Sequence, residues 1–175
     1  MRRTVLKYGL LAGLILVVFF LTTKGFWMSP DGKMDMNKGY IFGYVNMILS
    51  LSMVFFGVRH YRNTYLEGKI NFGKALWVGF LIALVASAIY VIGWMTYANV
   101  TGSAQDFMVQ YQEHMKQEWV ESGMQAEEMA KKTEEFQKFM EMYKNPFFMA
   151  LMTLFEILPV GILVALISAF LLKKK

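Results

Sequence analysis

Long apolar runs alternate with charged segments along the chain. The longest run extends from Phe147 to Leu172, and shorter runs cover residues 5–23, 40–58 and 75–97. A helix needs about 20 apolar residues to cross the hydrocarbon core of a bilayer. The pattern therefore predicts an all-α integral membrane protein, a single domain with four transmembrane helices, of which the last covers residues 147–172.

The segment between the third and fourth runs, residues 104–144, is rich in Glu and Lys. Its apolar residues recur at helical spacing; they are Phe107, Tyr111, Met115 and Trp119, then Met129, Phe136, Met140 and Tyr143. We expect an amphipathic helical hairpin, with helices at about 104–121 and 125–144 and a break at Gly123. Its apolar stripe either packs on the bundle and the lipid headgroups or binds a partner or ligand.

Small residues recur at intervals of four in three of the predicted spans. They are Gly9 and Gly13 in the first span, Gly79, Ala83 and Ser87 in the third, and Gly161, Ala165 and Ala169 in the fourth. This spacing places them on one helix face, where they allow a neighbouring backbone to approach closely. We therefore expect a tightly packed bundle.

The cations indicate an orientation in the membrane. Most of them belong to the side that holds both termini and the loop between the second and third spans. They are Arg2, Arg3, Lys7, Arg59, Arg62, Lys69, Lys74, Lys173, Lys174 and Lys175. Short loops rich in Lys and Arg stay in the cytoplasm. We therefore predict that both termini are cytoplasmic and that residues 104–144 are extracytoplasmic, and we expect a turn at Pro30–Gly32 on that same outer side.

The first run resembles a secretory signal, because Arg2 and Arg3 precede an apolar stretch. Two features favour a retained helix instead. The run is long, and the following residues Lys24–Trp27 contain no pair of small residues at which a signal peptidase would cleave.

Composition narrows the function classes. The chain has 175 residues, 56% of them hydrophobic, a net charge of +5 and no Cys, which excludes disulfides, thiolate metal sites and cysteine nucleophiles. The cations lie at helix ends, so we expect no nucleic-acid partner. No metalloprotease, hydrolase or phosphate-loop motif is present, and the two histidines, His60 and His114, fall on opposite sides of the membrane. We expect no catalytic residue, cofactor or metal, and no enzyme.

Glu156 is the only ionisable residue between Phe147 and Leu172. A carboxyl group at this depth is expensive and usually faces a bundle interior or a wet cavity. Pro159, which has no N–H, leaves the carbonyl of Phe155 without its helical donor. The polar residues expected at similar depth are Asn46, Ser50, Ser87 and Tyr90. With no cation at that depth we expect the neutral acid.

Three interpretations of Glu156 remain open. It handles protons or cations, or it is a neutral acid hydrogen-bonded across the bundle, or it is a carboxylate that extends outward to the interface.

The chain resembles a family of small bacterial inner-membrane proteins known as domain of unknown function 4199. The segments that carry the resemblance are Lys7–Gly9, Phe56–Arg59 with Tyr61 and Arg62, Phe72–Ala75, Gly93–Met95, Tyr143–Phe147 and Glu156–Gly161. The resemblance implies four helices and a Gram-negative inner membrane, and it implies no activity, substrate or catalytic residue.

Two functions from different classes fit these patterns. The first is a non-enzymatic structural or accessory subunit of an envelope complex. The second is a small ion- or proton-coupled transporter or channel component that uses Glu156. The expected partners are the lipid bilayer and either further copies of the chain or an envelope protein.

Overall fold

The computed structural model describes residues 1–29 and 32–174, and within them the chain is all-α. The turn predicted at Pro30 and Asp31 and the terminal cation Lys175 lie outside the described residues. The elements in chain order are α1 (Arg2–Thr23), the 3₁₀ turn η1 (Lys24–Phe26), α2 (Met36–Leu51), α3 (Met53–Tyr65), α4 (Phe72–Thr101), α5 (Ser103–Glu121), α6 (Ala126–Tyr143) and α7 (Pro146–Leu172).

Among the described residues, four helical segments are long and apolar enough to cross a membrane, and the chain is a four-span membrane protein. They are Arg2–Phe26, Met36–Tyr65, Phe72–Thr101 and Pro146–Leu172, and each contains one of the four apolar runs. The second span is made of α2 and α3, which meet at Ser52. There the Ser52 hydroxyl donates a hydrogen bond to the carbonyl of Leu49 at 2.6 Å.

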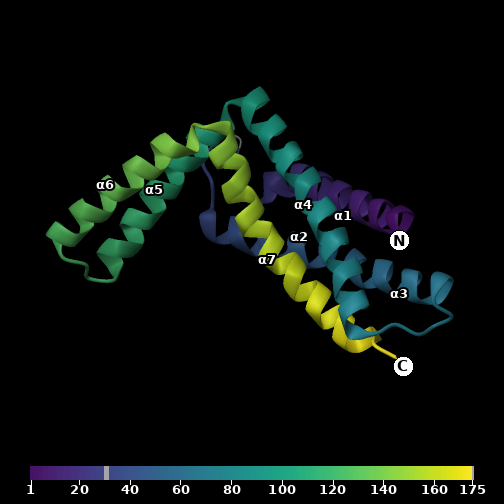
Figure 1. Cartoon of the computed structure of the whole chain (residues 1–175). Helices are drawn as coiled ribbons and strands as arrows, with labels where there is room; N and C mark the ends of the chain where they lie inside the picture. Colours follow the sequence, from purple (N-terminus) through teal and green to yellow (C-terminus); the bar gives the residue numbers. More distant parts are fainter. Residues whose placement is uncertain (30–31, 175) are drawn as a thin grey trace.

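The helix α4 lies at the centre of the bundle and packs against α7, α1 and α3 (Figure 1). Small residues let α4 and α7 approach each other closely. A Cβ atom at Gly79 would lie 2.9 Å from the Cβ of Ala165, and one at Gly161 would lie 2.8 Å from the Cβ of Ala83. The two helices therefore exchange small residues across one seam, and the stripes predicted from the sequence lie at this contact.

A second close seam joins α1 to α4. A Cβ atom at Gly9 would lie 2.6 Å from the Cβ of Val85, and one at Gly13 would lie 2.6 Å from the Cβ of Ile89. Because lipid tails are as apolar as the helix surfaces, such close packing is a main source of helix association in membranes.

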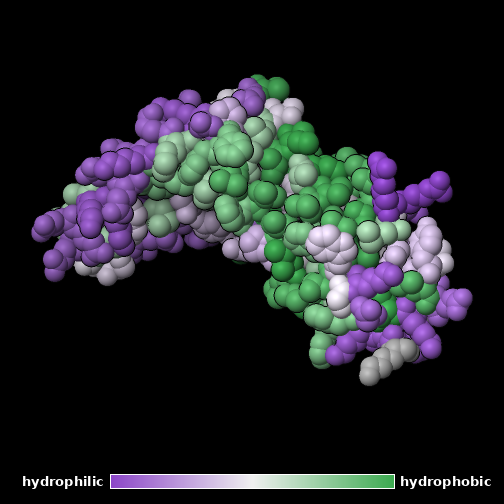
Figure 2. All heavy atoms as spheres, in the orientation of Figure 1, coloured by the Kyte–Doolittle hydropathy of each residue, from purple (hydrophilic) through white to green (hydrophobic). Residues whose placement is uncertain are grey.

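Both termini lie at the same end of the bundle (Figure 1). Near the C-terminus, Ile70 and Lys174 exchange backbone hydrogen bonds of 3.0 and 2.9 Å, and a guanidinium N–H of Arg62 donates to the carbonyl of Leu172 at 3.2 Å. The ring of Tyr8 lies 5.6 Å from that of His60, which ties the start of α1 to α3. Figure 2 shows hydrophilic residues at this end and a hydrophobic surface over the spans.

The helices α5 and α6 form an arm, residues 103–143, that extends away from the four spans (Figure 1). The change of direction after α4 occurs at Gly102, and the turn between the two helices contains Gly123. Both glycines have positive φ angles, 68° and 73°, which residues with a side chain rarely adopt. The surface of the arm is mostly hydrophilic on the face in Figure 2.

Candidate functional site

The base of the α5–α6 arm is joined to the spans by a continuous row of aromatic side chains. Neighbouring ring centroids are 5.6 to 6.1 Å apart, a separation typical of favourable aromatic pairs. The row runs through Phe20, Trp94, Phe107, Tyr111, Phe136, Phe139 and Phe148. It connects α1, α4, α5, α6 and α7, so the arm is held by packing as well as by its two chain connections.

Polar contacts reinforce the same joint. The indole N–H of Trp94 donates to the hydroxyl of Tyr143 at 3.2 Å. Burial raises the pKa of Tyr143, so its phenol stays neutral and serves as the acceptor. On the other side of the arm, the carboxamide of Gln110 accepts from the N–H of Met34 at 2.7 Å and donates to the carbonyl of Gly32 at 2.9 Å. Gln110 therefore clamps α5 to the loop between α1 and α2.

The far part of the arm carries an open cleft of about 570 Å³. Apolar and polar residues both line it; they are Lys116, Met124, Ala126, Met129, Ala130, Thr133, Glu134 and Gln137. Between Ser103 and Tyr143 the sequence has nine acidic residues and four lysines, so the arm is negatively charged. The cleft itself is lined by apolar residues, one Lys and one Glu, on an arm whose net charge is negative.

Glu156 lines a small cavity of about 50 Å³ between α1, α2, α4 and α7. Asn46 and Tyr90 line the same cavity, and the other lining residues are Leu16, Phe20, Thr23, Trp27, Phe42, Gly43 and Met47. A polar cavity of this size has room for ordered water. The structure therefore brings together three of the six residues selected from the sequence.

The two selected serines, Ser50 and Ser87, make other hydrogen bonds. The side-chain N–H of Asn46 donates to the carbonyl of Leu16 at 3.0 Å, and its oxygen accepts from Ser50 at 3.0 Å. The hydroxyl of Ser87 donates to the carbonyl of Ala83 within α4 at 2.8 Å. Ser50 and Ser87 therefore belong to helix packing, and their hydroxyl groups donate elsewhere than to Glu156.

Glu156 itself is exposed on the surface of the bundle. Pro159, one turn further along α7, is exposed as well, and α7 continues through it to Leu172. The structure thus places Glu156 at the mouth of the cavity, with part of its side chain exposed on the surface of the bundle.

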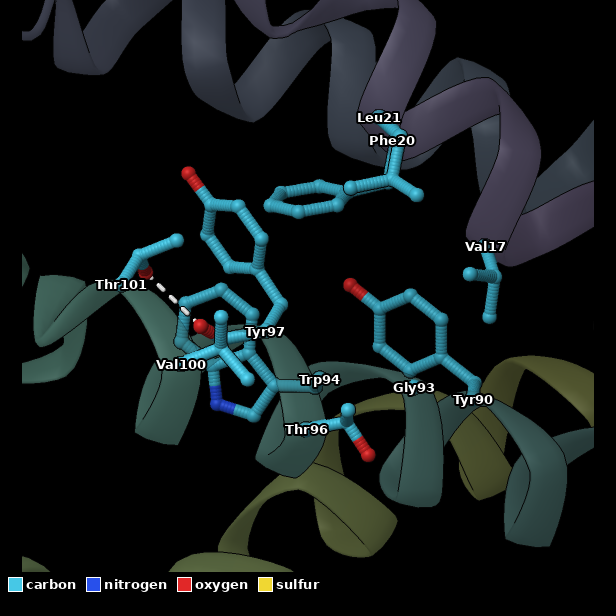
Figure 3. Close-up of a pocket in the computed structure, with 10 residues that line it drawn as sticks. All are labelled: Val17, Phe20, Leu21, Tyr90, Gly93, Trp94, Thr96, Tyr97, Val100 and Thr101. Carbon is cyan, nitrogen blue, oxygen red and sulfur yellow. Dashed lines mark hydrogen bonds between the residues drawn. The ribbon is translucent and has the colours of Figure 1, made fainter.

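An aromatic groove of about 350 Å³ lies between α1 and α4 and shares Phe20 and Tyr90 with the small cavity. Figure 3 shows the rings of Phe20, Tyr90 and Tyr97 facing the same space. Its other lining residues are Val17, Leu21, Gly93, Trp94, Thr96, Val100 and Thr101. None of them is an acid or a base that ionises near neutral pH, so the groove has the character of lipid-facing surface.

The histidines take part in separate contacts. His60 packs between the rings of Tyr8 and Tyr65, and the imidazole of His114 lies 3.5 Å from the carboxylate of Glu118. Within residues 1–29 and 32–174, no three metal-ligating side chains gather into a group that could hold an ion.

The comparisons with known proteins give a family and no activity. A profile of the family described as "Protein of unknown function (DUF4199)" matches residues 7–174. No curated protein and no solved structure matches the chain. The match covers nearly the whole chain, with most of the first span and all of the other three, and the chain therefore belongs to the DUF4199 family.

Proposed function

We propose that this protein is a non-enzymatic accessory subunit of an envelope complex in a bacterial inner membrane. Both termini are cytoplasmic, and the α5–α6 arm is extracytoplasmic and binds another envelope protein. The observation that carries the proposal is the arm itself, which extends from the bundle and is fixed at its base by the aromatic row and by Gln110. A fixed, extended arm presents a surface without losing much conformational freedom on binding.

The cleft on the arm indicates the chemistry of the partner. Its apolar lining residues, such as Met129 and Ala130, suit an apolar side chain, and flexible Met side chains adapt to varied shapes. Because the arm is acidic, the complementary segment carries Lys or Arg around that apolar anchor. The orientation rests on the distribution of Lys and Arg, which gather at the end of the bundle that holds the termini.

The test is a pull-down of the full chain from native membranes in mild detergent, followed by mass spectrometry. Wild type is compared with Ala130→Glu, which places a carboxylate in the cleft. The matched control is Met142→Glu, which adds the same group at an exposed position of α6 outside the cleft. A basic envelope protein recovered with wild type and control, and lost with Ala130→Glu, supports the proposal. Equal recovery with all three chains would reject the cleft as the binding surface.

A second function is favoured by one observation, the cavity that Glu156 shares with Asn46 and Tyr90. In that case the protein is a component of a small proton- or ion-coupled transporter, and Glu156 accepts and releases the proton. Glu156→Gln keeps the shape of the side chain but cannot ionise. Proton flux into proteoliposomes that is abolished by Glu156→Gln would support this function, whereas equal flux with both chains would reject it.

A further inference from the structure

One face of α7 is mostly exposed on the surface of the bundle and has the spacing of a helix–helix contact. Its residues follow one another at intervals of four, three, four, three and four, the spacing of a helix–helix seam; they are Met152, Glu156, Pro159, Leu163, Leu166 and Phe170. Met152 is half-buried and the others are exposed. The small residues Gly161 and Ala165, on the other side of α7, already pack against α4.

This face differs chemically from the other outward faces of the spans. The exposed residues along the middle of α1, such as Leu14 and Val18, and those along α2, such as Ile41 and Ile48, are apolar and suit lipid tails. The α7 face has the same apolar character except at Glu156. Lipid tails offer a carboxyl group neither a donor nor an acceptor, so leaving Glu156 against them is costly.

We propose that this α7 face is covered by the same face of a second copy of the chain. Copies in one membrane share one orientation, so a two-fold axis along the membrane normal sets the two α7 helices parallel. Residues near the axis then meet their own counterparts at equal depth, and Glu156 meets Glu156. Two neutral carboxyl groups are self-complementary, because each donates one hydrogen bond to the other and accepts one from it.

A single polar pair in an otherwise apolar seam also selects one alignment of the helices. Sliding one α7 by a turn would leave both carboxyl groups without partners, so the pair fixes the register as buried polar residues do in coiled coils. The apolar residues Leu163, Leu166 and Phe170 continue the seam toward the C-terminal end of α7. This dimer is independent of the protein that the α5–α6 arm binds.

Disulfide cross-linking tests the geometry, and the absence of Cys from the natural chain removes any background. Leu163→Cys places a thiol on the proposed seam. The matched control is Leu14→Cys on the outward face of α1, since the two leucines are 57% and 55% exposed. Disulfides form only where two Cα atoms come within about 7 Å. Leu163→Cys should therefore form dimers in proteoliposomes at high lipid-to-protein ratio, and Leu14→Cys should not.

A second measurement tests the carboxyl pair. Dimer fractions of the purified full chain are determined by single-molecule photobleaching in liposomes for wild type, Glu156→Gln and Glu156→Leu. Glu156→Gln retains a donor and an acceptor and should dimerise like wild type. Glu156→Leu should lower the association constant about tenfold, in line with interhelical hydrogen bonds in membranes.

Three results would overturn the proposal. The first is equal cross-linking of Leu163→Cys and Leu14→Cys. The second is a Glu156→Leu chain that dimerises as well as wild type, because the carboxyl pair would then be irrelevant. The third is a purified chain that stays monomeric, together with a Leu163→Cys chain that forms a disulfide with a different protein in native membranes. The α7 face would then bind a helix of that other protein. None of these results bears on capture of a partner by the arm.

Discussion

The seam between α4 and α7 allows a quantitative test of the packing. Gly79→Ala adds one methyl group at a point where the partner cannot move aside. The new Cβ atom would lie 2.9 Å from the Cβ and 3.3 Å from the Cα of Ala165. Carbon atoms prefer separations of about 3.5–4.0 Å. The obstacle is close to the backbone of α7, so the two helices have to separate by roughly half an ångström or more.

Two effects oppose each other in this variant. Replacing Gly by Ala inside a helix gains about 1 kcal/mol of helix propensity, while overpacking a close contact costs about 1–3 kcal/mol. Gly43→Ala is the matched control, because Gly43 lies within α2 and nothing approaches its Cβ position within 4 Å. We expect Gly79→Ala to be less stable than Gly43→Ala by about 1–3 kcal/mol, which is the packing cost alone.

The assay is equilibrium unfolding in mixed micelles with increasing sodium dodecyl sulfate, followed by tryptophan fluorescence. The double variant Gly79→Ala with Ala165→Gly moves the methyl group from one helix to the other and should recover most of the lost stability. Equal unfolding midpoints for Gly79→Ala and Gly43→Ala would show that the seam is looser than the structure has it. A double variant less stable than both single variants would also contradict the reasoning.

Two further predictions concern the side of the membrane that carries the arm. Gln110→Ala removes both hydrogen bonds from α5 to the α1–α2 loop, so hydrogen exchange at the Met34 amide should become about tenfold faster. The control Gln117→Ala changes an exposed residue of the same helix and should leave this exchange rate unchanged. Asp35 caps α2, and the backbone N–H of Lys38 holds the pKa of its carboxyl below the usual value. The cap therefore contributes to the free energy of unfolding at neutral pH, and this contribution is lost as the pH falls through that lowered pKa. An NMR titration midpoint for Asp35 within the ordinary aspartate range would contradict this.

The sequence was sufficient to predict four spans and the small residues at which they pack most closely. Span length and apolar content are local properties, and the four runs lie inside the four membrane-length segments. The small-residue stripes were equally readable, since only a residue without a large side chain permits contacts such as Gly79 with Ala165. A stripe at intervals of four identifies both the residues and the face that they share.

The joint between the arm and the bundle carried no comparable signal. Gln110 is one of several glutamines on α5, and nothing near it in the sequence distinguishes it from Gln117. Its partners, Met34 and Gly32, lie more than 70 positions away in the chain. The aromatic row likewise depends on where five separate helices meet, and ring spacing along one helix predicts only that a face is apolar.

The sequence analysis left the direction of Glu156 open, although the sequence contains a reference for it. Depth in the membrane follows from counting residues, but the face that a residue occupies needs a reference on the same helix. In a membrane helix apolar residues give no reference, because lipid and core are equally apolar. The small residues do. At about 100° per residue, Glu156 lies about 140° around α7 from Gly161 and about 180° from Ala165. Since Gly161 and Ala165 face α4, Glu156 points away from that seam and lies exposed at the mouth of the cavity, where a partner from outside the chain can reach its carboxyl group.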